Sequence, residues 1–331
     1  MDFTQSQSHT GVGGQSGFAV PLVVAVTGHR DLLATELPGI RDRVSEFLSA
    51  MQRDYPDRRL RVMSPLAEGA DRLVAEVALE LGIDLIVPMP MAKSLYEADF
   101  RTAESRQQFE LLCARASEIY ELPVAKGNTV TGISTAGPER SRQYAQLGVF
   151  LCAHCHILLA VWDGKLTGDL GGTAQVVKFH HDDIMPGYTP KTLATQQMLV
   201  DDESDLIYHI VCSRDRPDGA PRDGLTPLDW SWFTKDQHNP RSRELPKQHQ
   251  LIFERTGEFS REAVQHGQEI EAEKYPLYKA EQASQLPSGV ADINFLFCIA
   301  DWLAIRYQKK VLLALRATHV LAFLMGLMFI L

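Results

Sequence analysis

Short apolar runs alternate with longer amphipathic stretches over the first two hundred residues of the chain. Each apolar run has about the length of a strand, and the runs predict strands at residues 20–26, 59–65, 83–90, 117–122, 156–163 and 205–213. Apolar positions at helical spacing predict helices between them, at residues 36–53, 68–81, 94–116, 138–152 and 171–181. Strands that are apolar throughout are typical of sheets buried on both faces. The alternation therefore predicts an α/β fold, in which helices cover both faces of a parallel sheet.

The pattern changes after residue 213. Residues 214–250 are rich in Pro, Asp, Arg and Trp, which predicts an irregular excursion. A mostly polar helix is predicted from about 250 to 282, and an amphipathic helix at 292–305. The predicted domains follow these changes: a disordered tail at 1–17, an α/β domain at 18–213, the excursion and polar helix at 214–288, and the amphipathic helix with a last apolar segment at 289–331.

The last segment, residues 311–331, is apolar except for Arg316, Thr318 and His319. A helix of this length extends roughly 30 Å, about the thickness of the hydrocarbon core of a bilayer. We therefore expect a transmembrane helix. A buried C-terminal helix is the alternative, because the unbroken apolar run begins only at Val320. The run continues to the last residue, so we expect either a shortened chain or a second span that follows in the natural protein.

The two ends of the chain also bear on its location. Arg306, Lys309 and Lys310 precede the apolar segment, and the positive-inside rule then predicts a cytoplasmic N-terminal bulk anchored to the inner membrane. Residues 1–17 are rich in Ser, Gln and Gly and have no basic stretch followed by an apolar one, so we expect no secretory signal peptide.

Charge and cysteine content exclude two classes of protein. The chain has 33 Lys and Arg residues against 42 Asp and Glu residues, a net charge of −9. We therefore expect no chain-wide basic surface for duplex nucleic acid, whereas a local pocket for an anion is compatible with this charge. Five cysteines in 331 residues form no disulfide framework, and the odd number fits a reducing compartment.

Candidate ligand-binding residues lie where three predicted strands end and helices begin, the edge at which open parallel sheets bind ligands. Glycine there allows a close backbone approach, threonine and arginine donate hydrogen bonds to phosphate, and the free N–H groups of a helix start attract anions. The candidates are Thr27, Gly28, His29 and Arg30 after the first strand, Glu68, Gly69, Ala70 and Asp71 after the second, and Asp163, Gly171, Gly172 and Thr173 after the fifth. Together they predict one nucleotide-like pocket.

The same segments resemble a known family. TGHRD, AEGADRLVAEVALELG and GDLGGTAQVV are similar to the three signature loops of the SLOG superfamily, which includes the Rossmann domain of DNA-processing protein A and the Lonely Guy phosphoribohydrolases. The resemblance covers roughly residues 18–212 and implies a Rossmann-like fold that binds nucleotides or nucleotide-derived ligands. It also implies a place in bacterial conflict systems, where SLOG domains are fused to effectors, including membrane-spanning ones. The implied ligand contacts are Gly28, Arg30, Gly69, Asp71, Gly171, Gly172 and Thr173.

One departure from this family distinguishes a sensor from an enzyme. The phosphoribohydrolases carry a glutamate three residues after the threonine of the last loop, and this glutamate supports glycosidic cleavage. Val176 occupies that position here, and a valine neither accepts a proton nor stabilises an oxocarbenium charge. We therefore expect binding without turnover. The alternative is a nucleotide phosphoribohydrolase-like hydrolase that uses Glu68 or Asp163 instead; a DNA-handling protein is disfavoured by the acidic charge.

Two groups of metal-capable side chains have simpler explanations. Cys152, Cys155 and His156 match the C-x-x-C-H pattern of haem attachment, but that attachment needs an exported domain. Small buried cysteines also suit the core position predicted there. His180 and His181 are adjacent on a predicted helix and therefore point in different directions. We expect neither a metal nor a cofactor.

The whole pattern predicts a cytoplasmic sensor of a nucleotide-derived signal that is coupled to a membrane-embedded effector. A single span does not enclose a pore, so we expect a homo-oligomer. The resemblance places this sensor in bacterial antiphage defence. Its expected partners are a nucleotide-derived small molecule, the membrane and further copies of the chain, and not duplex nucleic acid.

Overall fold

The computed structural model describes residues 20–166, 169–189, 205–235, 241–279, 281–282 and 286–328. The tail predicted at residues 1–17 lies outside these ranges. Within them, residues up to Gly257 form one compact unit and residues from Glu258 onward form another. The domain boundaries predicted at residues 213 and 288 stay predictions.

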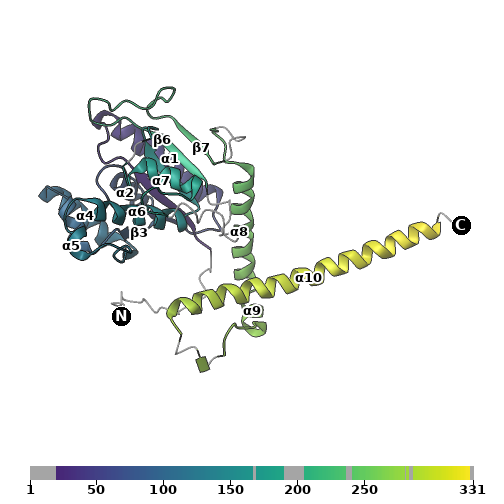
Figure 1. Ribbon diagram of the computed structural model, residues 1–331. Coiled ribbons are helices and arrows are strands. Elements are labelled where there is room, and N and C mark those ends of the chain that lie inside the picture. The colour runs from purple at the N-terminus through teal and green to yellow at the C-terminus, as the bar shows by residue number, and fades with distance from the viewer. Residues whose placement is uncertain are drawn as a thin grey trace. The chain divides into compact units, whose positions relative to one another are not determined.

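A seven-stranded sheet organises the first unit (Figure 1). Its strands are β1 (Leu22–Gly28), β2 (Leu60–Met63), β3 (Asp84–Met89), β4 (Glu118–Glu121), β5 (Ile157–Trp162), β6 (Ile207–Val211) and β7 (Trp230–Phe233). The order across the sheet is β4-β3-β2-β1-β5-β6-β7, and all neighbours are parallel except β6 and β7. The chain therefore builds outward from β1 in one direction as far as β4, returns to β5, and builds outward in the other direction.

Helices cover both faces of this sheet, as the sequence predicts. One face packs against α1 (Leu37–Asp54), α2 (Ala70–Glu80) and α4 (Ala103–Arg115), whose apolar residues share a core with alternate residues of the strands. The other face packs against α6 (Pro138–Ala153) and α7 (Thr173–Asp182). The predicted α/β fold class is therefore confirmed, and the strand order makes it Rossmann-like.

Three details differ from the sequence prediction. The helix predicted at 94–116 is divided into α3 (Lys93–Tyr96), a 3₁₀ turn (Glu97–Asp99) and α4, because the Thr102 side chain caps α4 by accepting a hydrogen bond from the Ser105 amide. A short helix, α5 (Val130–Ile133), has no counterpart in the prediction. Strand β7 lies inside the predicted excursion and pairs antiparallel with β6, where Trp232 opposes Tyr208 and is buried in the core.

The second unit is helical. Helix α8 (Lys247–Gln265) runs into this unit and is followed by α9 (Gly267–Glu273), so the polar helix predicted to reach residue 282 ends earlier. Ala263, Ile270 and the α10 residues Ile299, Trp302 and Leu303 form a small apolar cluster.

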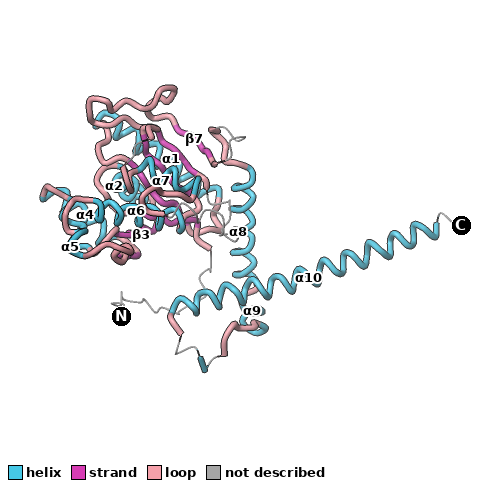
Figure 2. The backbone as a smooth tube through the Cα atoms, in the orientation of Figure 1, coloured by secondary structure: helices cyan, strands magenta, loops and turns pink. Residues whose placement is uncertain are grey.

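The amphipathic helix and the apolar segment predicted near the C-terminus form one continuous helix, α10 (Ser288–Met328, 41 residues), visible in Figure 2. Its apolar window has a mean hydropathy of 1.9 and is 0% buried. By length and composition, α10 is the one helix among the described residues that is suited to crossing a membrane.

Candidate ligand site at the carboxyl edge of the sheet

A cavity of about 280 Å³ opens at the carboxyl ends of the strands, beside the neighbouring strands β1 and β5. The strand order reverses between these two strands, and open α/β sheets bind ligands at such a switch point. The wall is formed by the segments after β1 and β2, by the start of α7, by α6 and by Arg214, three residues after the end of β6. The fold thus brings all three predicted junctions to one place.

Eight of the twelve predicted site residues line this cavity: Thr27, Gly28, His29, Arg30, Asp71, Gly171, Gly172 and Thr173. The other four, Glu68, Gly69, Ala70 and Asp163, do not appear in the wall. That the lining residues bind a ligand stays a prediction.

The four remaining residues have structural contacts behind the wall. Glu68 accepts a short hydrogen bond from the Ser105 hydroxyl on α4. The Ala70 amide donates to the His29 carbonyl at 3.1 Å, which joins the start of α2 to the loop after β1. Asp163 is fully buried, and its Oδ1 lies 3.1 Å from His29 Nε2.

Two of the glycines are required by close packing. A Cβ on Gly28 would lie 2.3 Å from the Ala70 Cβ, so only glycine lets α2 approach β1 this closely. Gly69 has a φ of +81°, and a Cβ there would lie 2.4 Å from the Arg30 carbonyl oxygen and 2.5 Å from that of His29. Both glycines therefore hold α2 against the loop that carries His29 and Arg30.

We predict that Gly69→Ala destabilises the full chain by about 3 kcal/mol, because it combines an unfavourable φ with a backbone clash. Gly82→Ala is the matched control, since Gly82 has a φ of +70° but nothing within 4 Å of its added Cβ. We expect the control to cost only about 1 kcal/mol. Denaturant unfolding of both variants in detergent measures the difference, and equal losses would contradict the packing role of Gly69.

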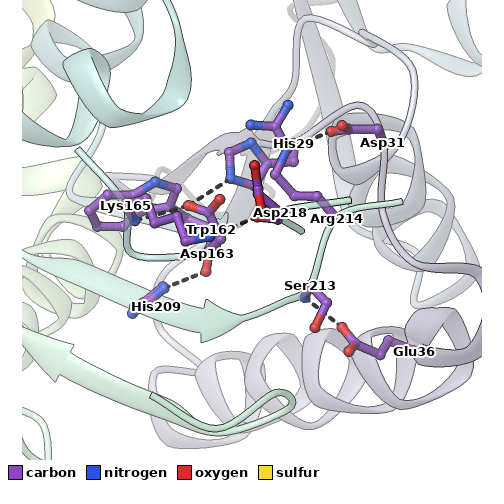
Figure 3. A network of polar contacts seen from close by, with 10 residues as sticks. All are labelled: His29, Asp31, Glu36, Trp162, Asp163, Lys165, His209, Ser213, Arg214 and Asp218. Atoms are coloured by element: carbon purple, nitrogen blue, oxygen red, sulfur yellow. Dashed lines mark hydrogen bonds and ion pairs between the residues drawn. The ribbon is translucent and has the colours of Figure 1, made fainter. Parts of the chain in front are cut away.

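The cavity carries two arginines. Arg30 is exposed, its guanidinium carbon lies 5.6 Å from the centre of the Tyr144 ring, and no carboxylate among the described residues pairs with it. Arg214 instead pairs with Asp31, with 2.8 Å between Nε and Oδ1 (Figure 3). Asp31 belongs to the junction predicted after the first strand, whereas sequence reasoning missed Arg214 as a lining residue. Arg214 follows the end of β6, so the same strand-end argument would have found it at a fourth junction.

The start of α7 forms another part of the wall. Gly172 is its N-cap residue and supplies no side-chain cap, so the first N–H groups of the helix have no capping side chain there. Gly171 has a φ of +78°, and a Cβ would lie 2.7 Å from the Ala145 amide nitrogen, which fixes this loop against α6. Val176 also lines the cavity.

Asp71 is a buried carboxylate of the wall. It is 5% exposed, and its Oδ1 has no hydrogen-bond partner among the described residues. Burial raises the pKa of the Asp71 carboxyl to about 7, against the opposite effects of Arg30 and of a hydrogen bond from the Ala67 backbone. A buried carboxylate with a free oxygen is an acceptor for a ligand hydroxyl or amine.

His29 connects the cavity to a buried polar network, drawn in Figure 3. Its Nε2 lies 3.1 Å from Asp163 Oδ1 but has no hydrogen-bond partner among the described residues. Asp163 Oδ1 accepts a hydrogen bond from the Lys165 amide at 2.9 Å. Burial lowers the pKa of His29; Asp163 and Asp31 act to raise this pKa, and Arg214 acts to lower it further. The imidazole is therefore neutral near pH 7.

The other metal-capable groups serve packing. Cys152 and Cys155 are buried in the core beside α7, and the His180 ring contacts the Leu206 carbonyl at 3.3 Å. Within the described ranges, no three His, Cys, Asp or Glu side chains form a group suited to a metal ion.

No protein-family model matches the chain, and no curated protein matches it. Among solved structures, DNA processing protein A from Streptococcus pneumoniae is 15% identical over 43% of this chain and 41% of that one, with a TM-score of 0.26. DNA processing protein A from Helicobacter pylori, for which a single-stranded DNA binding mode is described, is 15% identical over 49% of this chain and 62% of that one, with a TM-score of 0.29. The match thus spans less than two thirds of either relative.

Proposed function

We propose that this protein senses a nucleotide-derived ligand in the cavity at the switch point of the sheet and passes the signal to a membrane-embedded effector through α10. The observation that carries the proposal is the pairing, in one cavity, of an unpaired guanidinium with an unpaired buried carboxylate oxygen. A nucleotide offers the matching groups, because its phosphate accepts hydrogen bonds from arginine and its ribose or base donates to a carboxylate.

The helix start at Thr173 supports the same assignment. N–H groups at a helix N-terminus attract anions, and Gly172 and Thr173 line the cavity that Arg30 also lines. Thr27 adds a hydroxyl. A phosphate bound here contacts donors from both β1 and α7, so its binding tightens two loops that belong to opposite faces of the sheet. The resemblance of these loops to the SLOG superfamily agrees with this ligand class and with a role in bacterial conflict systems.

Helix α10 supplies the membrane part of the proposal. Its apolar segment follows Arg306, Lys309 and Lys310, and the positive-inside rule then supports a sensing unit on the cytoplasmic side of the inner membrane. Coupling needs a ligand that binds two states of the protein with different affinity. A pore needs more than the single span that α10 supplies, so the proposed active form is a homo-oligomer.

A binding screen tests the proposal. We expect at least one of AMP, ADP-ribose and cyclic di-AMP to raise the melting temperature of the full chain in detergent. Arg30→Ala should weaken that binding about 10- to 100-fold, because a charge-assisted hydrogen bond contributes roughly 1.5–3 kcal/mol. The matched control is Arg53→Ala, which removes an exposed arginine of α1 that pairs with its neighbour Asp54. Equal affinities of the wild-type protein and Arg30→Ala would contradict the proposal.

A hydrolase that uses Glu68 has less support from the geometry. Glu68 is hydrogen-bonded to Ser105 and stands outside the cavity wall, and Val176 occupies the wall where the phosphoribohydrolases carry their glutamate.

A further inference from the structure

We propose that the cavity hydrolyses a phosphate ester or anhydride bond of the ligand it binds, with His29 as general base and Asp163 as the residue that positions it. The inference rests on the proposed function, because the same cavity must first bind the ligand. Such cleavage would limit the duration of the signal. The sensor would hydrolyse the ligand that activates it, and the activated state would decay at the rate of cleavage.

His29 is held firmly in the wall. Its backbone amide donates to the Val161 carbonyl of β5 at 3.1 Å, and its own carbonyl accepts from the Ala70 amide at 3.1 Å. The side chain lines the cavity, yet the residue is only 8% exposed. The ring therefore has the fixed position that a general base requires, with Nε2 beside Asp163.

Asp163 determines which ring nitrogen is the base. Its Oδ1 lies 3.1 Å from Nε2, outside hydrogen-bond geometry, and the negative charge of the carboxylate favours the neutral tautomer that carries its proton on Nε2. Nδ1 then keeps its lone pair, and no described residue hydrogen-bonds to it. Asp163 itself is fully buried and is fixed by the Lys165 amide. This is the arrangement of a histidine base oriented by a carboxylate.

The charged groups that face His29 suit an anionic substrate. Asp163 and Asp31 stabilise the imidazolium that forms when the ring takes a proton, and Arg214 opposes it before substrate binds. Arg214 and Arg30 both line the cavity and offer guanidinium groups to the non-bridging phosphate oxygens. Charge that develops on these oxygens in the transition state is then stabilised beside the base.

The step balances with water as the only co-reactant. Nδ1 of His29 removes a proton from a water molecule, and the water oxygen forms a bond to phosphorus. The bond from phosphorus to the bridging oxygen breaks, and the electron pair stays on the leaving oxygen. The imidazolium returns its proton to that oxygen, so one ester or anhydride linkage and one water give a phosphate and an alcohol, or two phosphates.

The test uses the full chain in detergent, with ATP, ADP-ribose and cyclic di-AMP as probes. Binding is measured by thermal shift, and cleavage by ³¹P NMR in ¹⁸O-labelled water. We expect a bound probe to be cleaved with one ¹⁸O atom in the product phosphate. His29→Ala should reduce the cleavage rate by about 100-fold or more while the affinity changes less than fivefold. His29→Gln is a second variant in case the alanine variant fails to fold. His154→Ala, which removes an exposed histidine at the end of α6, is the control expected to keep full activity.

The pH dependence of cleavage distinguishes a general base from a His29–Asp163 pair that serves only the fold. With a true base, the cleavage rate rises with pH as His29 loses its proton and then becomes constant, and Asp163→Asn shifts that rise to lower pH because it removes a charge that stabilises the imidazolium. A bound probe that returns intact would overturn this inference and leave the proposed function standing. Cleavage that persists in both His29 variants would also overturn it. Failure of all three probes to bind would remove the proposed function and this inference together.

Discussion

Replacing Val320 and Leu324 by aspartate is expected to release the chain from membranes. The span from 311 to 328 contains nine Leu, Val and Phe residues, which together favour insertion by about 4–5 kcal/mol at roughly 0.5 kcal/mol each. Each aspartate near the middle of a span costs about 3 kcal/mol, so two of them outweigh that gain. We therefore expect the double variant in the soluble fraction after alkaline extraction of membranes, where the wild-type chain stays in the pellet.

The matched control replaces the same two residues by alanine. This change shortens two apolar side chains without adding charge, so the control should remain in the membrane. If both double variants remained membrane-bound, α10 would not be the anchor, and the membrane part of the proposed function would fail. If both were released, α10 would still be the anchor, but the loss of apolar side-chain surface rather than the added charge would explain the release.

The strands of the sheet could be predicted because a strand that is buried on both faces has an unbroken run of apolar residues in the sequence. A parallel strand covered by helices is apolar at every position, as in β5, where all six residues are buried. Strand β7 has no such apolar run. It has four residues, lies at the antiparallel edge, and alternates Trp230 and Trp232 with a polar and a partly exposed residue inside a Pro- and Asp-rich segment.

The sequence could predict where the site lies, because it shows where the strands end, but not the role of each residue in the site. The residues after β1, β2 and β5 meet at one edge because parallel strands end together, and the sequence shows where each strand stops. It does not show which glycine faces a ligand and which faces a helix. Gly69 was predicted to contact the ligand, which stays a prediction; in the fold, its missing Cβ makes room for two carbonyl oxygens of the loop after β1. That distinction depends on the distance between α2 and β1, which no local pattern encodes.

That the Asp71 carboxylate forms no ion pair with its neighbour also could not be predicted from the sequence. Its neighbour Arg72 could have paired with it, but the Arg72 guanidinium turns away to the Leu66 carbonyl and to Ser105 and Gln108 on α4. Among the described residues, the carboxylate is therefore left in the wall with the Ala67 amide as its one hydrogen-bond partner. Consecutive residues on a helix point in different directions, so their adjacency in sequence predicts no ion pair.

This isolation gives Asp71 a large expected effect on stability. The carboxyl has a pKa of about 7 in the fold and an ordinary value of 3.8, so the folded state binds the proton more tightly than the unfolded state. A raised pKa contributes stability that is fully present below about pH 4 and is lost as the pH rises to about 7. A shift of this size corresponds to about 4 kcal/mol at 1.4 kcal/mol per pH unit.

We therefore expect Asp71→Asn to stabilise the full chain against denaturant by about 2–4 kcal/mol at pH 8 and by nothing at pH 4, because an amide cannot ionise but still lacks one partner. The difference between the two proteins at each pH isolates Asp71 from the buried histidines, which titrate in both. The same substitution should weaken binding of any probe that the wild-type protein binds, since the amide oxygen is a poorer acceptor than a carboxylate. If Asp71→Asn gains stability and loses binding, the Asp71 carboxylate serves ligand binding at a cost in stability. If the gain in stability is equal at pH 4 and pH 8, the ionisation of Asp71 is not the source of that gain.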